Sequence, residues 1–438
     1  MKPVLYLFHR DLRITDNPAL LAACRTGSPV IPCALLPDPH ENSHGARFIV
    51  ESLKDLAEEL SRAGGVLYLF DLPAVQAVRH VKEQTGADRL FTEQDEDCRW
   101  YGLMEKLSAL TSLHPAGLRT LTDPRKLLKA DGTPYQVFTP FLNRAKQEDP
   151  DPPEGTASCR WYTRSIPQTV PLPDPPPVKG SLRGGRSEGL SILDKLGSLD
   201  SYEDIRDIPD MPTSRMSPHL AWGTISVREL YFRARELFSP GAVYINEVYW
   251  RDFWYAIAHH VPHVFQGSYH RKYDHILWDE NPGALERWKS GVTGFPLVDA
   301  GMRELDATGF MHNRVRMITA SFLTKDLHIN WQEGESWFAS RLTDFDRCVN
   351  NGNWQWAAST GCDAQPFFRI FNPWSQQRRY DPDARYIKRW IPELRSADPA
   401  DIHRHEQDHI PGYPSPMVNH KVERLTALER YRSAGMKG

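Results

Sequence analysis

Residues 350–356 have the sequence Asn-Asn-Gly-Asn-Trp-Gln-Trp, and residues 311–317 have the sequence Met-His-Asn-Arg-Val-Arg-Met. In both runs amides and charged groups alternate with large apolar side chains. A tryptophan-rich helical core explains the rings but not the polar groups between them. A flat heteroaromatic ligand, such as a flavin or a nucleobase, explains both, because it offers a face for stacking and polar edges for hydrogen bonds. These runs predict a ligand-binding region.

The composition bounds the class of protein. The chain has 438 residues, of which 40% are hydrophobic and 25% charged, as in soluble globular proteins of two or three domains. No apolar run is long enough to span a membrane, and the apolar part of the N-terminus is too short for a secretory signal. We therefore expect a cytoplasmic protein. The net charge of −3 does not indicate nucleic acid, so any DNA contact requires a local basic patch.

The first part of the chain predicts an α/β domain over residues 1–130. Short β-type runs at 4–8, 30–36, 66–70 and 89–92 alternate with segments of helical periodicity, which is typical of a doubly wound parallel sheet. Asn17 followed by Pro18 is a helix start signal.

The rest of the chain has a different pattern. Residues 131–189 are rich in proline and glycine and predict a long connector. After it the β signals fade, and 11 of the 13 tryptophans lie beyond residue 200. We expect residues 190–438 to form an all-α domain.

Several common motifs are missing or out of place. The first β run is not followed by GxGxxG, and no P-loop sequence occurs. Residues 185–189 match GxSxG, but they lie in the connector and not after a strand. The histidine groups at 259–263 and 403–409 lack metal-ligand spacing, so no metal is expected. Six cysteines without a CxxC pair predict reduced thiols.

The stretch from residue 311 to residue 373 resembles the flavin domain of the photolyase and cryptochrome family. Further blocks at 10–17, 135–141, 213–218 and 246–253 resemble the same family, in the same order. The resemblance extends from residue 10 to about residue 390. It is strongest to the cyclobutane pyrimidine dimer photolyases of the class I and class III type.

The resemblance implies FAD, bound without a covalent link, and an electron passed to a pyrimidine dimer after light absorption. The hydroxyls of residues 213–217 and their expected helix start suit a pyrophosphate. In the family, the residue at Asn350 faces flavin N5, where a neutral amide can accept a hydrogen bond without adding charge. The resemblance implies that FAD is bound by Tyr202, Thr213, Ser214, Arg215, Met216, Ser217, Glu247, Arg251, Asn313, Arg316, Asp344, Asp346 and Asn350.

Three functions are compatible with the family: cyclobutane dimer repair, six-four photoproduct repair and blue-light signalling. Six-four enzymes have histidines where this chain has Asn313 and Met317, which disfavours their proton-transfer chemistry. Signalling remains the main alternative, although cryptochromes usually have a long C-terminal tail. The catalytic set that the resemblance implies is Glu247, Asn313, Met317, Trp250 and Trp356. Glu247 would bond the thymine edge, while Trp250 and Trp356 would form the walls of a pocket for the flipped dimer.

The resemblance also implies an electron-hopping chain and contacts to UV-damaged DNA. Trp278, Trp331 and Trp354 would form the hopping chain. Arg206, Arg314 and Arg369, with Trp250 and Trp356, would bind the DNA. The protein is expected to be a monomer.

Two departures from the family pattern stand out. Tyr244 occupies a position where the family often has tryptophan, which keeps an aromatic ring but adds a hydroxyl. Residues 92–100 lack the Asn-Glu-Arg pattern of folate-binding relatives. A second chromophore that acts as an antenna is therefore possible, and the sequence does not identify it.

Overall fold

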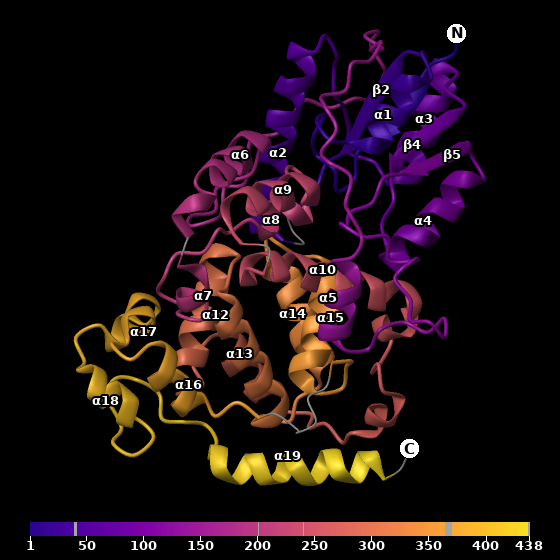
Figure 1. The fold of residues 1–438 in the computed structure, drawn as a ribbon. Helices are drawn as coiled ribbons and strands as arrows, with labels where there is room; N and C mark the ends of the chain where they lie inside the picture. Colours follow the sequence, from indigo (N-terminus) through magenta and orange to yellow (C-terminus); the bar gives the residue numbers. More distant parts are fainter. Residues whose placement is uncertain (39–41, 200, 240, 364–369, 437–438) are drawn as a thin grey trace. The chain divides into compact units, whose positions relative to one another are not determined.

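The computed structural model describes residues 1–438 except 39–41, 200, 240, 364–369 and 437–438 (Figure 1). The chain divides into two compact units. The first comprises residues 1–135, 139–200 and 214–260, and the second comprises 136–138, 201–213 and 261–438. Because units are defined by packing and domains by independent folding, the domain boundaries predicted at residues 130 and 189 stay predictions.

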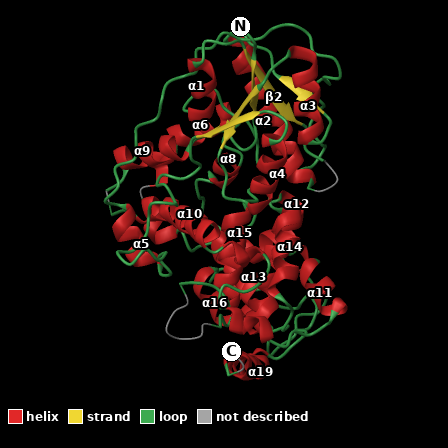
Figure 2. Ribbon diagram, turned by 90° about the vertical axis from the view of Figure 1, so that its right-hand side faces the viewer, coloured by secondary structure: helices red, strands yellow, loops and turns green. Residues whose placement is uncertain are grey.

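The first unit is built on a five-stranded parallel sheet with the order β3-β2-β1-β4-β5. The strands are β1 (Val4–Leu7), β2 (Val30–Leu35), β3 (Tyr68–Phe70), β4 (Arg89–Glu93) and β5 (Ser112–Ala116). The order changes direction at β1, which identifies a doubly wound sheet. Figure 2 shows the strands in yellow among the flanking helices.

Side chains of β1 alternate between two cores. Val4 and Tyr6 pack with residues of α1 (Pro18–Arg25) and α2 (Ser43–Arg62). Leu5 and Leu7 pack with residues of α3 (Ala74–Thr85) and α4 (Cys98–Ser108). Both faces of the sheet are therefore covered, which explains the continuous apolar runs of the strands.

The structure shows the cap predicted at Asn17 and helices with one buried face. The Asn17 side chain accepts a hydrogen bond from the Leu20 N–H at 3.0 Å, and Pro18 opens α1. In α2, the buried side chains Phe48, Leu53, Leu56 and Leu60 follow a spacing of three to five residues along one face. Local capping and amphipathicity thus determine both helices.

The proline-rich segment packs against the α/β core. The Tyr162 N–H donates to the Val30 carbonyl at 2.9 Å, and Trp161 forms a bridge with Val30. Ala157 and Ile166 are buried in the two sheet cores. A segment whose composition predicts a surface connector therefore contributes apolar contacts to the fold.

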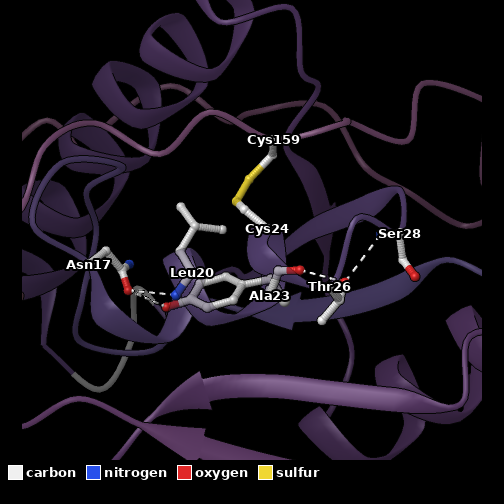
Figure 3. Close-up of a disulfide and its surroundings, with 8 residues drawn as sticks. Asn17, Leu20, Ala23, Cys24, Thr26, Ser28 and Cys159 are labelled. Carbon is white, nitrogen blue, oxygen red and sulfur yellow. Dashed lines mark hydrogen bonds between the residues drawn. A yellow bond between two sulfur atoms is a disulfide. The ribbon is translucent and has the colours of Figure 1, made fainter.

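The expectation that all six cysteines are reduced thiols is wrong for two of them. Cys24, in the last turn of α1, forms a disulfide with Cys159, and their Cα atoms are 4.8 Å apart (Figure 3). The two residues are separated by 135 positions, so spacing alone did not indicate the pair. Tertiary packing of the proline-rich segment beside α1 brings them together.

The first unit also contains helices from the middle of the chain. Their bounds are α6 (Arg186–Asp194), α8 (Ser217–Ala221), α9 (Val227–Leu237) and α10 (Val243–His260), with most of α5 (Phe138–Ala145) and the 3₁₀ turn η1 (Leu196–Leu199). The carboxylate of Asp252 on α10 accepts from the N–H and the hydroxyl of Thr122, both at 2.9 Å. Such buried bonds fix α10 against the α/β part of its unit.

The second unit is helical throughout its described residues, apart from turns and loops. Its α-helices are α7 (Tyr202–Ile205), α11 (Pro282–Lys289), α12 (Pro296–Thr308), α13 (Asn313–Lys325), α14 (Trp331–Arg341), α15 (Arg347–Ala358), α16 (Pro373–Tyr380), α17 (Arg385–Trp390), α18 (Pro399–Arg404) and α19 (His420–Gly435). Its 3₁₀ turns are η2 (Pro262–Phe265), η3 (Arg271–His275) and η4 (Pro392–Leu394). The predicted combination of an α/β part and an all-α part is confirmed.

The helix lengths and compositions also bear on membrane association. Among the residues that the structure describes, no helix combines the length and the apolar composition needed to cross a bilayer.

The disulfide gives a first prediction. The protein, denatured without reductant, should expose four titratable thiols, those of Cys33, Cys98, Cys348 and Cys362. After reduction with dithiothreitol all six cysteines should react. The measurement is a thiol count with a chromogenic disulfide reagent. Six reactive thiols before reduction would contradict the Cys24–Cys159 bond.

Candidate functional site

The start of α13 presents polar groups predicted for the site. His312 caps the helix, its Nδ1 accepting from the Arg314 N–H at 3.2 Å. Asn313 and Met317 lie one turn apart, with Asn313 Nδ2 at 3.9 Å from Met317 Sδ. They lie away from the buried Val315 and Ile318, so the helix offers an amide and a thioether on its accessible face.

An ion pair joins α13 to the loop before α15. Arg316 Nη2 lies 2.9 Å from Asp344 Oδ2, and the Asp344 side chain is only 4% exposed. The Arg316 Nε–H also donates to the Met311 carbonyl at 2.7 Å. The guanidinium thus bonds one carboxylate oxygen and one backbone carbonyl, which fixes the orientation of the buried carboxylate and suits recognition of a heterocycle's polar edge.

The predicted residues of α15 are placed by a local cap. Asp346 is the N-cap and accepts from the N–H groups of Cys348 and Val349 at 3.1 and 3.2 Å. Asn350 follows one turn later and is nearly buried. Asp346 thus uses part of its acceptor capacity to begin the helix that carries Asn350.

The Asn350 amide has a defined orientation. Its Nδ2 lies 3.2 Å from the backbone carbonyl of Glu335 on α14. A carbonyl oxygen can only accept, so the NH₂ group must face it and Oδ1 must point elsewhere. Asn350 therefore presents an acceptor, as its predicted role at a protonated flavin nitrogen requires.

Glu335 is a residue that the sequence reasoning missed. Its carboxylate accepts from Asn351 Nδ2 at 2.9 Å, and burial raises its pKa to about 6. Asn351 Oδ1 in turn accepts from Gln355 Nε2 at 3.2 Å. This buried polar chain ties α14 to α15 beside Asn350, but an isolated glutamate on a helix gives no sequence signal of it.

The three tryptophans predicted to conduct electrons belong to one apolar cluster. Trp331 and Trp354 are buried in it, and Trp278 is partly buried against it. The rings of Trp278 and Tyr431 have centroids 6.2 Å apart. Because the rings also serve as core, their contacts alone do not distinguish packing from electron transfer.

Two predicted residues lie one turn apart on α10, in the first unit. Glu247 and Trp250 are both partly buried, and the Trp250 ring packs near Phe253 and Trp254 with centroids 5.7 and 5.5 Å away. The spacing of three residues puts the carboxylate and the ring on one face of the helix.

The neighbouring Arg251 is held by groups of its own unit. It donates to the Arg119 carbonyl and lies over the Tyr255 ring at 4.6 Å. Its cofactor role stays a prediction.

A helix begins at Ser217, as the sequence predicts, and a turn precedes it. The helix that follows, α8, has only five residues and cannot supply a substantial helix dipole. Arg215 instead adopts a left-handed conformation with φ 51°, which is uncommon for a residue with a side chain. The turn lets the Met216 N–H donate to Ser214 Oγ at 3.4 Å.

The structure places the residues predicted to bind DNA in different surroundings. Arg314 Nη2 lies 2.7 Å from Asp207 Oδ2, and its guanidinium is 4.6 Å from the centroid of the Tyr380 ring. Arg206 follows α7 at the C-cap. Arg369 lies outside the described residues. Trp356 Nε1 donates to Asp363 Oδ2 at 3.3 Å, which fixes its ring. All four roles stay predictions.

Family models match both parts of the chain. Residues 4–157 match the model described as DNA photolyase, and residues 244–433 match the FAD binding domain of DNA photolyase. A deoxyribodipyrimidine photo-lyase of Halobacterium salinarum is 35% identical over 98% of this chain and 99% of its own length. The chain belongs to the DNA photolyase family. The resemblance inferred from the sequence blocks is confirmed.

Solved photolyase structures share the fold. A bacterial class III photolyase from Agrobacterium tumefaciens has a TM-score of 0.90 and 33% identity over 100% of this chain and 98% of its own. An archaeal photolyase from Sulfolobus tokodaii, with two FAD molecules, has a TM-score of 0.87 and 34% identity over 98% and 100%. A cryptochrome of Synechocystis sp. PCC6803 has a TM-score of 0.86 and 28% identity over 98% and 99%.

FAD is the cofactor of this photolyase family member, as the matched FAD-binding domain shows. The side chains fit it: Arg316 supplies donors, Asp344 is a carboxylate acceptor, and the Asn350 amide oxygen is turned away from the Glu335 carbonyl. The Sulfolobus photolyase contains two FAD molecules, so a member of this fold can hold a second chromophore.

Gly334 gives a prediction for this site. A Cβ atom there would lie 2.1 Å from Trp354 Cη2, so Gly334→Ala must displace the indole or separate α14 from α15. We expect a loss of about 1–3 kcal/mol in the free energy of unfolding. Urea unfolding measures it. The control is Gly283→Ala in α11, where the nearest atom would be 3.7 Å away and stability should be unchanged or slightly higher. Equal stability of both variants would contradict the close packing.

Proposed function

We propose that the chain is a deoxyribodipyrimidine photo-lyase, a lyase that uses light to repair cyclobutane pyrimidine dimers in DNA. The observation that carries this proposal is the near full-length match to photo-lyases together with the amide oxygen that Asn350 presents. Bound FAD supplies light absorption and the electron that splits the dimer.

The protein residues divide into groups that bind the cofactor and groups that act on the dimer. Asn350 Oδ1 accepts a hydrogen bond from flavin N5–H, which favours reduced flavin without adding charge. Arg316 and Asp344 hold the flavin ring edge, while Ser214 and its neighbours hold the phosphates. The complete cofactor set is Tyr202, Thr213, Ser214, Arg215, Met216, Ser217, Glu247, Arg251, Asn313, Arg316, Asp344, Asp346 and Asn350.

Glu247 acts on the thymine carbonyl edge as a neutral carboxylic acid, because a carbonyl oxygen can only accept a hydrogen bond. Its hydrogen bond strengthens as negative charge develops on the base, so it lowers the barrier more than it raises affinity. Trp250 and Trp356 stack on the flipped bases, and Asn313 and Met317 complete the contacts to the dimer. The accessible amide and thioether on α13 support these last two assignments.

Six-four repair is disfavoured by the same two residues. Asn313 and Met317 cannot provide the proton transfers for which six-four enzymes use histidine, and the Nδ1 atom of His312 is used to cap α13. Burial lowers the pKa of His312 to about 4, so it is uncharged at neutral pH. The alternative function is blue-light signalling, favoured only by the likeness to the Synechocystis cryptochrome.

The substrate is UV-damaged DNA, bound by one protein chain. Arg206, Arg314 and Arg369 contact phosphates, which position the duplex without reading its sequence. Repair of chromosomal DNA requires the compartment that holds it, which supports the cytoplasmic location expected from the sequence. An antenna chromophore of unassigned identity is compatible with the family.

The tryptophan chain gives one prediction. Trp331→Phe should slow light-driven reduction of oxidised FAD strongly while leaving repair by already reduced enzyme nearly intact, because repair returns its electron and needs no net reduction. Flavin absorbance under steady illumination measures the rate. Trp337→Phe is the matched control, since Trp337 lies on the same helix but beneath the cations Arg341 and Lys289. Photoreduction at the parent rate in Trp331→Phe would remove Trp331 from the path.

Lesion choice tests the function itself. The fully reduced protein should repair an oligonucleotide with a cyclobutane dimer in light and leave one with a six-four product unchanged. Trp250→Ala should weaken binding of the dimer by roughly 10- to 100-fold, since stacking contributes about 1–3 kcal/mol per base, and should barely affect undamaged DNA. Repair of the six-four product alone would refute the role of Asn313 and Met317. Repair of neither lesion would favour signalling.

A further inference from the structure

Tyr244 on α10 makes a contact through its hydroxyl, a group that the family's usual tryptophan lacks. Its hydroxyl donates to Ser214 Oγ at 3.0 Å, and both residues belong to the first unit. The Tyr244 side chain is buried and packs against Phe238 with ring centroids 5.5 Å apart. The hydroxyl that sets this sequence apart is therefore directed at a residue of the proposed phosphate-binding segment.

The direction of this hydrogen bond follows from acidity. A phenol is a stronger acid than an aliphatic alcohol, so between the two hydroxyls Tyr244 is the donor and Ser214 the acceptor. Burial raises the pKa of Tyr244 to about 12, which keeps its proton in place at neutral pH. Tyr244 thus remains a hydrogen-bond donor throughout the working pH range.

Ser214 Oγ receives a second hydrogen bond from the backbone. The Met216 N–H donates to it at 3.4 Å, in the turn formed by the left-handed Arg215. A hydroxyl oxygen has two lone pairs, and these two donors use both. The Ser214 hydroxyl can therefore act toward a ligand only as a donor. An anion accepts hydrogen bonds and cannot donate them, so the arrangement suits a phosphate oxygen.

We propose that Tyr244 is a positioning residue for the FAD pyrophosphate: by filling the acceptor capacity of Ser214, it directs the serine proton toward a phosphate oxygen. The inference rests on the proposed function, since it assumes that Ser214 contacts FAD. It adds a residue whose hydroxyl acts on the cofactor only through Ser214. It also assigns a purpose to the departure from tryptophan at this position.

The test compares two flavins that differ in the phosphates and the adenosine. Full-length protein is freed of flavin, and the dissociation constants of FAD and riboflavin are measured by fluorescence titration. Tyr244→Phe removes one hydroxyl and should weaken FAD binding by about threefold to tenfold. Riboflavin binding should stay within twofold of the parent, because riboflavin carries no phosphate.

Tyr249→Phe is the matched control. Tyr249 is also buried on α10, but its hydroxyl donates to Tyr231 at 3.3 Å. This variant should leave the affinities for FAD and riboflavin unchanged, whatever its effect on thermal stability. A merely structural role of Tyr244 predicts instead that both Tyr→Phe variants act on stability alone.

A double-mutant cycle separates positioning from packing. Ser214→Ala should weaken FAD binding at least as much as Tyr244→Phe, again without affecting riboflavin. In the Ser214→Ala background, Tyr244→Phe should have no further effect, since its target is gone. If Tyr244→Phe does not fold, Tyr244→Leu also removes the donor to Ser214 and should show the same selective loss for FAD.

The possible outcomes distinguish the role of Tyr244 from the proposed photo-lyase function on which it rests. Additive effects of the two substitutions, or equal losses for FAD and riboflavin, would overturn the role of Tyr244. An unchanged FAD affinity in Tyr244→Phe would do the same and leave the photo-lyase function intact. Failure of the parent protein to bind FAD would overturn the proposed function itself.

Discussion

Helices α14 and α15 approach each other at Gly334, where the absence of a Cβ atom leaves room for the Trp354 ring. This close approach places the Glu335 carbonyl within hydrogen-bonding distance of Asn350 Nδ2. The small size of Gly334 thus allows the Trp354 ring to pack between the helices and the Asn350 amide to be oriented by the neighbouring carbonyl. A larger residue would have to displace the indole or separate the helices, and separation would break the hydrogen bond between the Glu335 carbonyl and the Asn350 amide.

Polar groups in the second unit are positioned by other polar groups that do not themselves act on a ligand. Glu335 holds Asn351, and Asn351 accepts from Gln355, whose Oε1 accepts from the Tyr269 N–H at 2.7 Å. Buried polar atoms are costly unless they are paired, so such a network favours one arrangement of its helices. The amide-rich sequence of α15 therefore serves packing, and it also carries Asn350 of the proposed cofactor site.

Much of the fold could be predicted because its signals are local. The strand runs and the Asn17 cap depend on neighbours within a few residues, and the structure confirms them. The cysteine pair could not be predicted, because Cys24 and Cys159 meet only through packing of the proline-rich segment. The helix start predicted near Ser217 is present, but the sequence did not indicate that α8 ends after five residues.

The sequence by itself determined the family, the fold class and FAD as the cofactor, because those depend on residue types in a fixed order along the chain. Only the tertiary structure decided how individual groups are used. It alone shows that Asn350 turns its oxygen away from Glu335 and that Tyr244 donates to Ser214. The physical reason is that a hydrogen bond depends on the distance and direction between atoms of different helices or turns, and sequence order does not contain these quantities.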